Sequence, residues 1–401
     1  MNTPSTVKNL AARYAADTIT HRRTLHAAPE LSFQERETSA YIARTLTDWG
    51  IDCVSGIGGY GVVATIPGGS PGPVVVLRAD MDALPITEQT GLPFASTRPG
   101  VMHACGHDAH VACLLTAARI LQQIREQFGG VIRLIFQPAE EKLPGGAQAM
   151  IRDGVLTNPV PTVAVGQHIN PTLPTGVIGF RSGLFMASVD DLFLRIRGSG
   201  GHAANPDQLV DPVTIAAQII LSLQQVSSRL APPEVPTVLS IGQVIAGGAT
   251  NVIPTEVTME GTFRTVDETW RMAAHDHIRR IATRTAEAMN GTCEVEIQIG
   301  YPSLMNDLDL TARIEENARL YVGAERVQPL PLTMGGEDFA YYGRALPGCF
   351  YNLGVCPPDR LERSEPLHSP RLVVDEAALE VGAGFLAWNA VRELQHAAAA
   401  G

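Results

Sequence analysis

This 401-residue chain has few cysteines, few aromatic residues and no long apolar run. Its six cysteines are too sparse for a disulfide framework, which favours a reducing compartment. No apolar segment approaches the roughly 20 residues that a membrane span needs, and the first residues lack the basic start and apolar core of a secretory signal. The net charge of −11 disfavours nucleic acid and anionic membranes as partners. We therefore expect a cytoplasmic globular protein that binds neither.

The first half of the chain carries apolar, β-prone runs at residues 74–77, 131–136 and 161–168. Such runs are typical of strands buried on both faces of a parallel sheet. Ser32, with Glu35 three residues later, predicts a helix that begins at a capping box. This half of the chain therefore predicts an α/β domain whose central, mostly parallel sheet is flanked by helices.

The pattern changes between residues 188 and 300, where strands and helices are expected in the order β-α-β-β-α-β. Asp211 and Asp267 stand at the expected N-cap positions of the two helices. This order is that of a ferredoxin-like domain. Because this domain lies inside the chain, we expect three segments. They are 1–187 and 301–401 as the two parts of one catalytic domain, and 188–300 as an inserted domain.

Two adjacent acids, Glu140 and Glu141, follow the apolar run at residues 131–136. The expected strand would deliver both carboxylates to the carboxyl edge of the sheet, where open α/β sheets place their ligands. Two neighbouring carboxylates are costly there without a cation between them. A pair of divalent metal ions would satisfy this need, with one glutamate binding metal and the other acting as a general base towards a metal-activated water.

Other residues that can bind such ions stand in expected loops or at strand ends. These residues are Cys105, His107, His168 and His368. Thiolate, imidazole and carboxylate together suit Zn²⁺, and Mn²⁺, Co²⁺ or Ni²⁺ less selectively. Asp80 and Asp82 follow another expected strand, and two roles stay open for them. Both aspartates hydrogen-bond to the ring nitrogen of a ligand imidazole that does not bind metal, or Asp82 caps a turn.

Eight motifs recur in order along nearly the whole chain. They are RTLHAAPELSFQE, RADMDALP, HACGHDAH, FQPAEE, GGHAANP, NVIP, MGGEDFAYY and LHSP. With them the chain resembles the amidohydrolase branch of the aminoacylase and carboxypeptidase-like di-metal metallopeptidases. That branch includes hippurate hydrolases, N-acyl-amino-acid amidohydrolases and plant auxin-conjugate hydrolases.

The resemblance implies specific roles for residues at the matching positions. The two metal ions would bind Cys105, His107, Glu141, His168 and His368. Glu140 would be the base that deprotonates the attacking water, and His202 of the inserted domain would stabilise the oxyanion. Asn251 and Arg264 would hold the substrate's carboxylate, and the Gly335-Gly336 backbone would line the same pocket. The inserted domain would serve as a lid and in dimerisation, so a homodimer or homotetramer is expected.

The sequence departs from the family pattern at two places. Asp207 stands where a histidine is usual, and Lys142-Leu143-Pro144 replaces a glycine-rich stretch. Both departures lie where substrate choice could change. We therefore expect a metal-dependent hydrolase that cleaves the amide bond of N-acyl-L-amino acids, with the acyl group left open. The alternatives are a dipeptidase or aminopeptidase of the same wider family, or a catalytically silent metal- or ligand-binding module.

Overall fold

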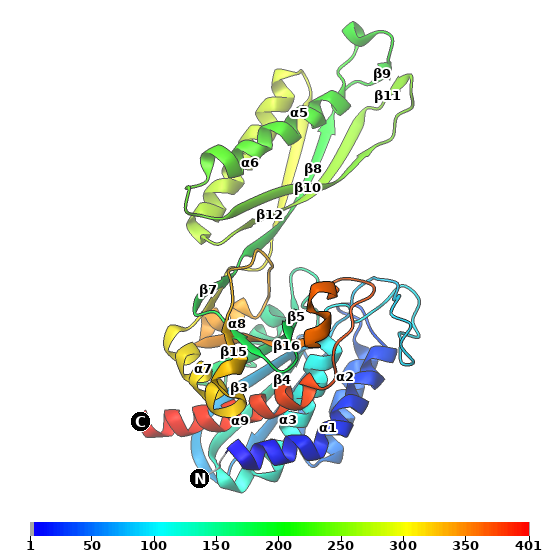
Figure 1. The fold of residues 1–401 in the computed structure, drawn as a ribbon. Coiled ribbons are helices and arrows are strands. Elements are labelled where there is room, and N and C mark those ends of the chain that lie inside the picture. The colour runs from blue at the N-terminus through cyan, green and yellow to red at the C-terminus, as the bar shows by residue number, and fades with distance from the viewer. Residues whose placement is uncertain (1–3, 401) are drawn as a thin grey trace. The chain divides into compact units, whose positions relative to one another are not determined.

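The computed structural model describes residues 4–400 and divides into two compact units (Figure 1). The larger unit comprises the chain up to Phe185, Met305–Pro331 and the chain from Asp338 onwards. The smaller unit comprises Met186–Leu304 and Leu332–Glu337. None of the helices in the described part of the chain is long and apolar enough to cross a membrane.

The larger unit is built on an eight-stranded sheet in the order β1-β2-β4-β3-β5-β16-β6-β15. Its strands are β1 (Asp52–Ile57), β2 (Gly61–Pro67), β3 (Ser70–Asp80), β4 (Gly129–Gln137), β5 (Val163–Pro174), β6 (Ile178–Phe180), β15 (Val327–Pro329) and β16 (Gly348–Cys356). The four central strands run parallel, whereas β1, β2 and β6 meet a neighbour in the antiparallel sense. The predicted fold class is confirmed.

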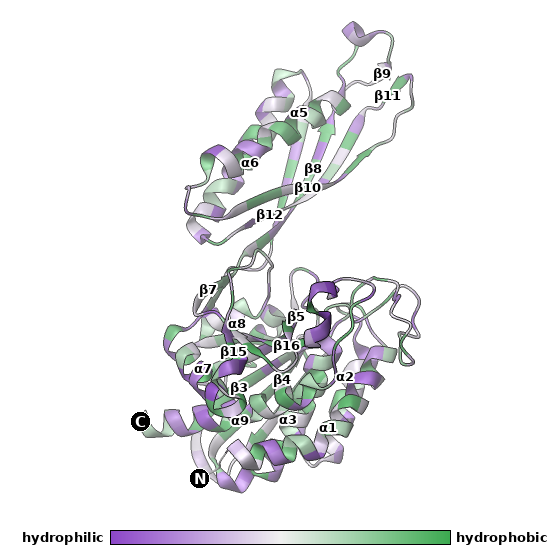
Figure 2. Ribbon diagram, in the orientation of Figure 1, coloured by the Kyte–Doolittle hydropathy of each residue, from purple (hydrophilic) through white to green (hydrophobic). Residues whose placement is uncertain are grey.

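Helices cover this sheet because the strands are apolar on both faces. The helices of the larger unit are α1 (Pro4–Ala27), α2 (Arg36–Asp48), α3 (His107–Gln123), α4 (Gly146–Arg152), α7 (Leu308–Val322), α8 (Ala340–Ala345) and α9 (Ala378–Ala400). Helices α1, α3 and α9 pack against one another, and α2 packs on β1 and β2. Figure 2 shows the hydrophobic residues gathered on the buried strands and on the inner sides of these helices.

The predicted capping box at Ser32 is wrong. Helix α2 begins at Arg36 instead, and Glu35 at its N-cap position makes no side-chain cap hydrogen bond. The Ser32 hydroxyl donates to the buried carboxylate of Asp82 at 2.6 Å. A hydrogen bond to a charged acceptor in the protein interior is stronger than one with a neutral helix amide. The acceptor, Asp82, lies 50 residues from Ser32 in the sequence.

The smaller unit is a four-stranded antiparallel sheet in the order β10-β12-β8-β13. Its elements follow the chain as β8 (Ser188–Arg197), α5 (Pro212–Gln225), β10 (Thr237–Ala246), β12 (Glu256–Thr265), α6 (Glu268–Ala288) and β13 (Thr292–Ile299). This is the predicted β-α-β-β-α-β order. Asp211 and Asp267 accept the predicted N-cap hydrogen bonds. Four short strands complete the chain, namely β7 (Gly183–Met186), β9 (Gly201–His202), β11 (Val252–Ile253) and β14 (Leu304–Asn306).

Candidate metal centre

Three parallel strands of the larger unit, β4, β3 and β5, end at one edge of the sheet (Figure 1). In the register of this sheet Asp80, at the end of β3, lies opposite Gln137, at the end of β4. The loop after β4 therefore brings Glu140 and Glu141 to this edge, and His168 lies within β5. The sequence pattern predicted that strand ends deliver these residues to the edge, which is wrong for His168, because β5 continues past it to Pro174.

The loop before α3 and the loop that carries His368 supply the other predicted ligands. Gly106 precedes α3 with a φ of +80°, and a Cβ there would lie 2.2 Å from Cδ1 of Ile169 on β5. The positive φ favours glycine here, and glycine also leaves room for the Ile169 side chain beside the start of α3. His368 has a φ of +66°, and its backbone N–H donates to the carbonyl of Ala104 at 2.8 Å. This hydrogen bond ties the His368 loop to the segment that precedes Cys105.

The structure brings the five predicted ligands together. Their donor atoms form groups whose members all lie within 4.8 Å of one another. These groups are Cys105 with His107 and His168, Cys105 with Glu141 and His368, and His107 with Glu140 and Glu141. Because each of these groups shares a member with another, the donors form one continuous cluster. A divalent ion bound at about 2.0–2.3 Å from each donor would require separations of this size.

The distances within this cluster suit a cation that is shared between donors. The Cys105 Sγ lies 3.4 Å from the Nε2 of His168, and the Glu141 Oε1 lies 3.1 Å from the Nε2 of His368. The His107 Nε2 and the Glu141 Oε1 are buried atoms without a hydrogen-bond partner, 3.9 Å apart. Buried polar atoms are normally satisfied. A divalent ion would satisfy both atoms, so the donor set fits metal.

Asp82 contacts two of these ligand residues. Its carboxylate accepts the backbone N–H of Glu141 at 2.9 Å, and its Oδ1 lies 3.2 Å from the Nδ1 of His107. With Nδ1 held in this way, the Nε2 of His107 is the nitrogen directed towards the other donors. The sequence left open whether Asp82 orients an imidazole or caps a turn, and in the structure it contacts the imidazole.

Asp80 is fully buried, as Asp82 is. It accepts from the Nδ1 of His110 at 2.5 Å and from Arg78 at 2.7 Å. Arg78 also donates to Asp338 at 2.8 Å and to Gln137 at 2.9 Å. These buried contacts join β3, β4 and the segment that begins at Asp338.

Sequence reasoning missed His110 and Arg78. His110 forms a group with Asp80 and His107, yet its Nε2 accepts the backbone N–H of Ile169 at 2.9 Å. Both ring nitrogens of His110 are thus occupied, and the side chain links α3 to β3 and β5. Its position three residues after His107 on one helix was a signal that could have identified it.

The electrostatics of the cluster favour a positive ion. Burial and the charges of Glu141 and Glu140 raise the pKa of the Cys105 thiol well above its usual range. Burial lowers the pKa of His168 well below its ordinary value, so this imidazole is neutral and able to bind metal. Burial alone would lower the pKa of His107, but Asp80 and Asp82 outweigh it and raise that pKa to about 10. The carboxylates thus leave an excess of negative charge for a cation to offset.

The substrate residues predicted in the inserted segment lie in the smaller unit, in two groups. His202 in β9 pairs with Val252 of β11, and the carbonyl of Asn251 accepts the N–H of Ala203 at 3.1 Å. Both side chains are exposed. Asn251 directly precedes β11, so both residues lie at the short β9–β11 ladder, near the start of β12.

Arg264 lies near the other end of β12. Its guanidinium donates to the carbonyl of Met334 at 2.9 Å, which brings it beside Gly335 and Gly336. A Cβ at Gly336 would lie 2.3 Å from the Cγ2 of Val189, so the chain requires glycine there. At about 3.3 Å a residue, the length of β12 keeps Arg264 away from Asn251 within the smaller unit.

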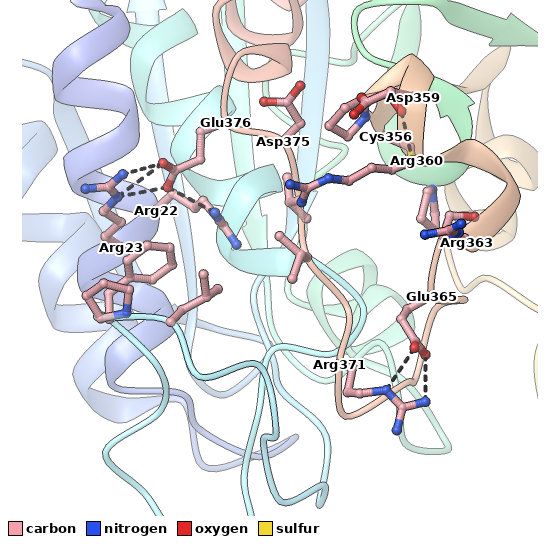
Figure 3. Close-up of a pocket in the computed structure, with 18 residues that line it drawn as sticks. Arg22, Arg23, Cys356, Asp359, Arg360, Arg363, Glu365, Arg371, Asp375 and Glu376 are labelled. Carbon is pink, nitrogen blue, oxygen red and sulfur yellow. Dashed lines mark hydrogen bonds and ion pairs between the residues drawn. The ribbon is translucent and has the colours of Figure 1, made fainter.

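A cavity of about 700 Å³ in the larger unit contains none of the five predicted ligands (Figure 3). Its lining includes five arginines and four acids, namely Arg22, Arg23, Arg360, Arg363 and Arg371 with Asp359, Glu365, Asp375 and Glu376. Figure 3 shows Arg22 and Arg23 paired with Glu376, and Arg371 paired with Glu365. Five of these nine charged side chains are thus paired with one another.

Comparison with known proteins gives the same family across the chain. A model of peptidase family M20/M25/M40 matches residues 76–388. The N-acetylcysteine deacetylase of Bacillus subtilis (strain 168) is 43% identical over 379 residues, which cover 94% of this chain and 97% of that protein. The N-acyl-L-amino acid amidohydrolase of Geobacillus stearothermophilus is 44% identical over 304 residues, which cover 76% of this chain and 82% of that protein.

A solved structure agrees with these sequence relatives. The YXEP protein of Bacillus subtilis, described as a dinuclear metal binding peptidase from the M20 family, superimposes with a TM-score of 0.78 at 38% identity. The match covers 96% of this chain and 99% of that one. The similarity therefore includes both compact units.

Proposed function

This chain belongs to peptidase family M20/M25/M40, and from this premise we propose that it hydrolyses the amide bond of N-acyl-L-amino acids with two divalent metal ions. The family assignment confirms the one that the ordered motifs predicted, and it makes the chain a hydrolase. The names of two relatives, an N-acetylcysteine deacetylase and an N-acyl-L-amino acid amidohydrolase, support this substrate class. Hippurate-like and other N-acyl conjugates fall within it.

One observation carries the proposal. Five ligand-capable side chains from four distant segments meet beside a buried glutamate at the carboxyl edge of the sheet. Cys105, His107, Glu141, His168 and His368 would hold the two ions, which are Zn²⁺, Mn²⁺, Co²⁺ or Ni²⁺ by the chemistry of these donors. When bound, the ions polarise the scissile carbonyl and acidify the attacking water.

The side chains of this protein would then handle the protons and the substrate. Glu140 accepts a proton from the attacking water as its oxygen adds to the acyl carbon, and later delivers that proton to the nitrogen of the leaving amine. The C–N bond breaks as the carbonyl re-forms, so the products are a carboxylic acid and a free amino acid. We propose His202 for stabilising the developing oxyanion in the site of a neighbouring subunit, because within one chain it lies near the opposite end of β12 from Arg264.

Arg264 is the residue we propose for the substrate's carboxylate. Asn251 lies near the opposite end of β12, so within one chain it would not reach the same carboxylate, and its predicted role in substrate binding stays a prediction. A guanidinium matches a carboxylate through two parallel hydrogen bonds. Arg264 is half-buried and already orders the Met334 carbonyl, which supports a binding role for the adjoining Gly335-Gly336 backbone. A substrate carboxylate would add to the contacts that this guanidinium makes.

Glu140→Gln tests the assignment of the base, because glutamine keeps the size of the side chain but cannot take up a proton at neutral pH. We expect turnover of N-acetyl- and N-benzoyl-amino acids to fall at least about 100-fold, the lower range that general base catalysis contributes. Metal content, measured by elemental analysis, should stay the same. A variant that keeps full rate, or loses its metal, contradicts this assignment.

A substrate panel tests the proposed activity itself. The enzyme is assayed after reconstitution with each candidate metal, on N-acyl-amino acids and in parallel on dipeptides with a free amino group. Hydrolysis of the N-acyl compounds alone is the expected result. Hydrolysis of the dipeptides alone would make the protein a peptidase of the same family, and no hydrolysis with any metal would make it a binding module.

A further inference from the structure

The motif PELSFQE, residues 29–35, has no part in the chemistry proposed so far, although it is one of the eight ordered motifs. In the structure this segment lies against the strand ends that carry the candidate metal centre. Leu31 forms a β-bridge with Ala83, and the carbonyl of Glu30 accepts the N–H of Ala83 at 2.8 Å. The segment is thereby fixed beside Asp82.

Glu35 is fully buried, and its side chain is turned towards the loop that carries the two adjacent glutamates. Its Oε1 accepts the backbone N–H of Ala139 at 2.7 Å and that of Phe33 at 3.0 Å. Its Oε2 is buried without a hydrogen-bond partner. Burying a carboxylate that is not paired with a cation is unfavourable. Capping of α2 does not explain this burial, because the side chain makes no cap hydrogen bond there.

Ala139 directly precedes Glu140 and has a φ of +51°, in the left-handed region that an alanine rarely adopts. A residue persists in such a conformation only where its surroundings hold it. The hydrogen bond from the Ala139 N–H to Glu35 is a contact that does so, across 104 residues of sequence. The direction in which Glu140 leaves this turn depends on that backbone conformation.

Ser32 of the same motif acts on the neighbouring side of the centre. Its hydroxyl donates to the Oδ2 of Asp82, the oxygen that also accepts the N–H of Glu141. The motif thus contacts the backbone on one side of Glu140 through Glu35, and the backbone on its other side through Ser32 and Asp82.

We infer that Glu35 is a positioning residue for the reaction: by accepting the Ala139 N–H it fixes the left-handed turn that aims Glu140 at the attacking water. Glu35 acts through Glu140 and touches no substrate atom. The inference rests on the proposed function, since it requires Glu140 to be the base. A displacement of about 1 Å at a reacting group can cost on the order of 100-fold in rate.

The test compares two substitutions of similar volume at the same site. Glu35→Gln keeps an oxygen that can accept the Ala139 N–H, whereas Glu35→Met fills the space with a thioether that accepts only weakly. Each variant is reconstituted with the same metal as the wild type. The measurements are kcat and KM for an N-acetyl-amino acid, metal content and Tm.

We expect Glu35→Gln to keep kcat within about threefold of the wild type. Glu35→Met should lose about 10- to 100-fold in kcat, because the group that is displaced is the base. KM and metal content should be unchanged in both variants. Rescue by glutamine together with a loss confined to kcat separates positioning from general support of the fold. Equal kcat in both variants would overturn the inference. A loss of metal in proportion to kcat in Glu35→Met would overturn it as well.

Glu35→Asp serves if the methionine variant fails to fold. It keeps the charge but shortens the side chain by one methylene, so it withdraws the carboxylate from Ala139, and kcat should again fall with KM unchanged. Wild-type kcat in this variant contradicts the inference. Glu140→Gln tests the proposed function separately. If Glu140→Gln is inactive while the Glu35 variants keep wild-type kcat, only the positioning role of Glu35 is wrong. If Glu140→Gln is fully active, the assignment of Glu140 as the base is wrong.

Discussion

At the scale of single residues, Asp82 illustrates how one buried side chain serves several partners. Its carboxylate contacts the Nδ1 of His107 and accepts hydrogen bonds from the backbone N–H of Glu141 and the hydroxyl of Ser32. Burial alone would raise the pKa of Asp82, but the hydrogen bond and charge of His107 outweigh it and lower that pKa. Asp82 is therefore an anion at neutral pH and fixes a proton on the Nδ1 of His107.

Asp82→Asn should weaken metal binding about 10- to 100-fold, since partners behind a ligand imidazole usually contribute that much to affinity. The asparagine removes the charge that holds the His107 proton while the volume stays the same. Titration against a competing chelator measures the affinity. Asp359→Asn, which changes an exposed acid of the larger unit, is the matched control and should bind metal as the wild type does. Equal affinities for the two variants would contradict this role of Asp82.

Sequence patterns predicted the ligand residues because four of the five were expected at strand ends or in loops next to recognisable elements. In the structure His168 lies within β5 and His107 is the first residue of α3. They did not predict the contacts that support these ligands. The hydrogen bonds from Ser32 to Asp82 and from Ala139 to Glu35 join residues 50 and 104 positions apart. Local spacing assigned Ser32 and Glu35 to a helix cap, which is the commoner local use of that pair. Only the tertiary fold reveals the competing acceptor.

At the scale of elements, the smaller unit was the more predictable part, because its pattern is local. In the sequence, Val257, Met259 and Phe263 alternate with polar residues, as in a strand with one buried face, and all three are buried in β12. Arg264 is half-buried next to the Met334 carbonyl. The sequence did not indicate that Leu332–Glu337 belongs with this unit in space. That association depends on backbone hydrogen bonds from Ala187 to Thr333 and Gly335, for which residue patterns give no signal.

The first strand and second helix of the smaller unit are joined by a buried charge network. Asp190 of β8 accepts from Arg271 of α6 at 2.9 Å and from His275 at 2.6 Å, and it also accepts the Gly300 N–H at 3.0 Å. Burial alone would raise the pKa of Asp190, but the hydrogen bonds from Arg271 and His275 outweigh it and lower that pKa. The folded state therefore favours the ionised carboxylate.

Asp190→Asn should destabilise the protein at pH 7 by about 3–5 kcal/mol, because it leaves the buried Arg271 without its counter-charge. The wild type gains this stability above the ordinary aspartate pKa of about 4, and loses it as the pH falls through the lower folded-state pKa. The difference between variant and wild type should therefore shrink below pH 4. Denaturant unfolding at pH 7, 5 and 3 measures it.

Asp276→Asn provides the control, since it changes an exposed acid on the same helix and should alter stability by no more than about 0.5 kcal/mol. A difference between Asp190→Asn and the wild type that stays constant down to pH 3 would show that the charge of Asp190 is not responsible.

At the scale of the whole molecule, the two units divide the proposed work. The larger unit carries the candidate metal centre and Glu140, and the smaller unit carries His202, Asn251 and Arg264. Within the smaller unit, His202 and Asn251 lie beside one end of β12 and Arg264 near the other. The resemblance also implies a homodimer or homotetramer, and that expectation stays a prediction.

The central claim is that distant segments of one chain meet at a centre for two divalent ions, and the number of ions bound per chain tests it most directly. Elemental analysis of the metal-saturated protein, after removal of free metal, should give two ions per chain. Cys105→Ala should give fewer, because Cys105 belongs to two of the donor groups. A wild type that retains no ion, or a Cys105→Ala variant that retains as many as the wild type, would contradict the account.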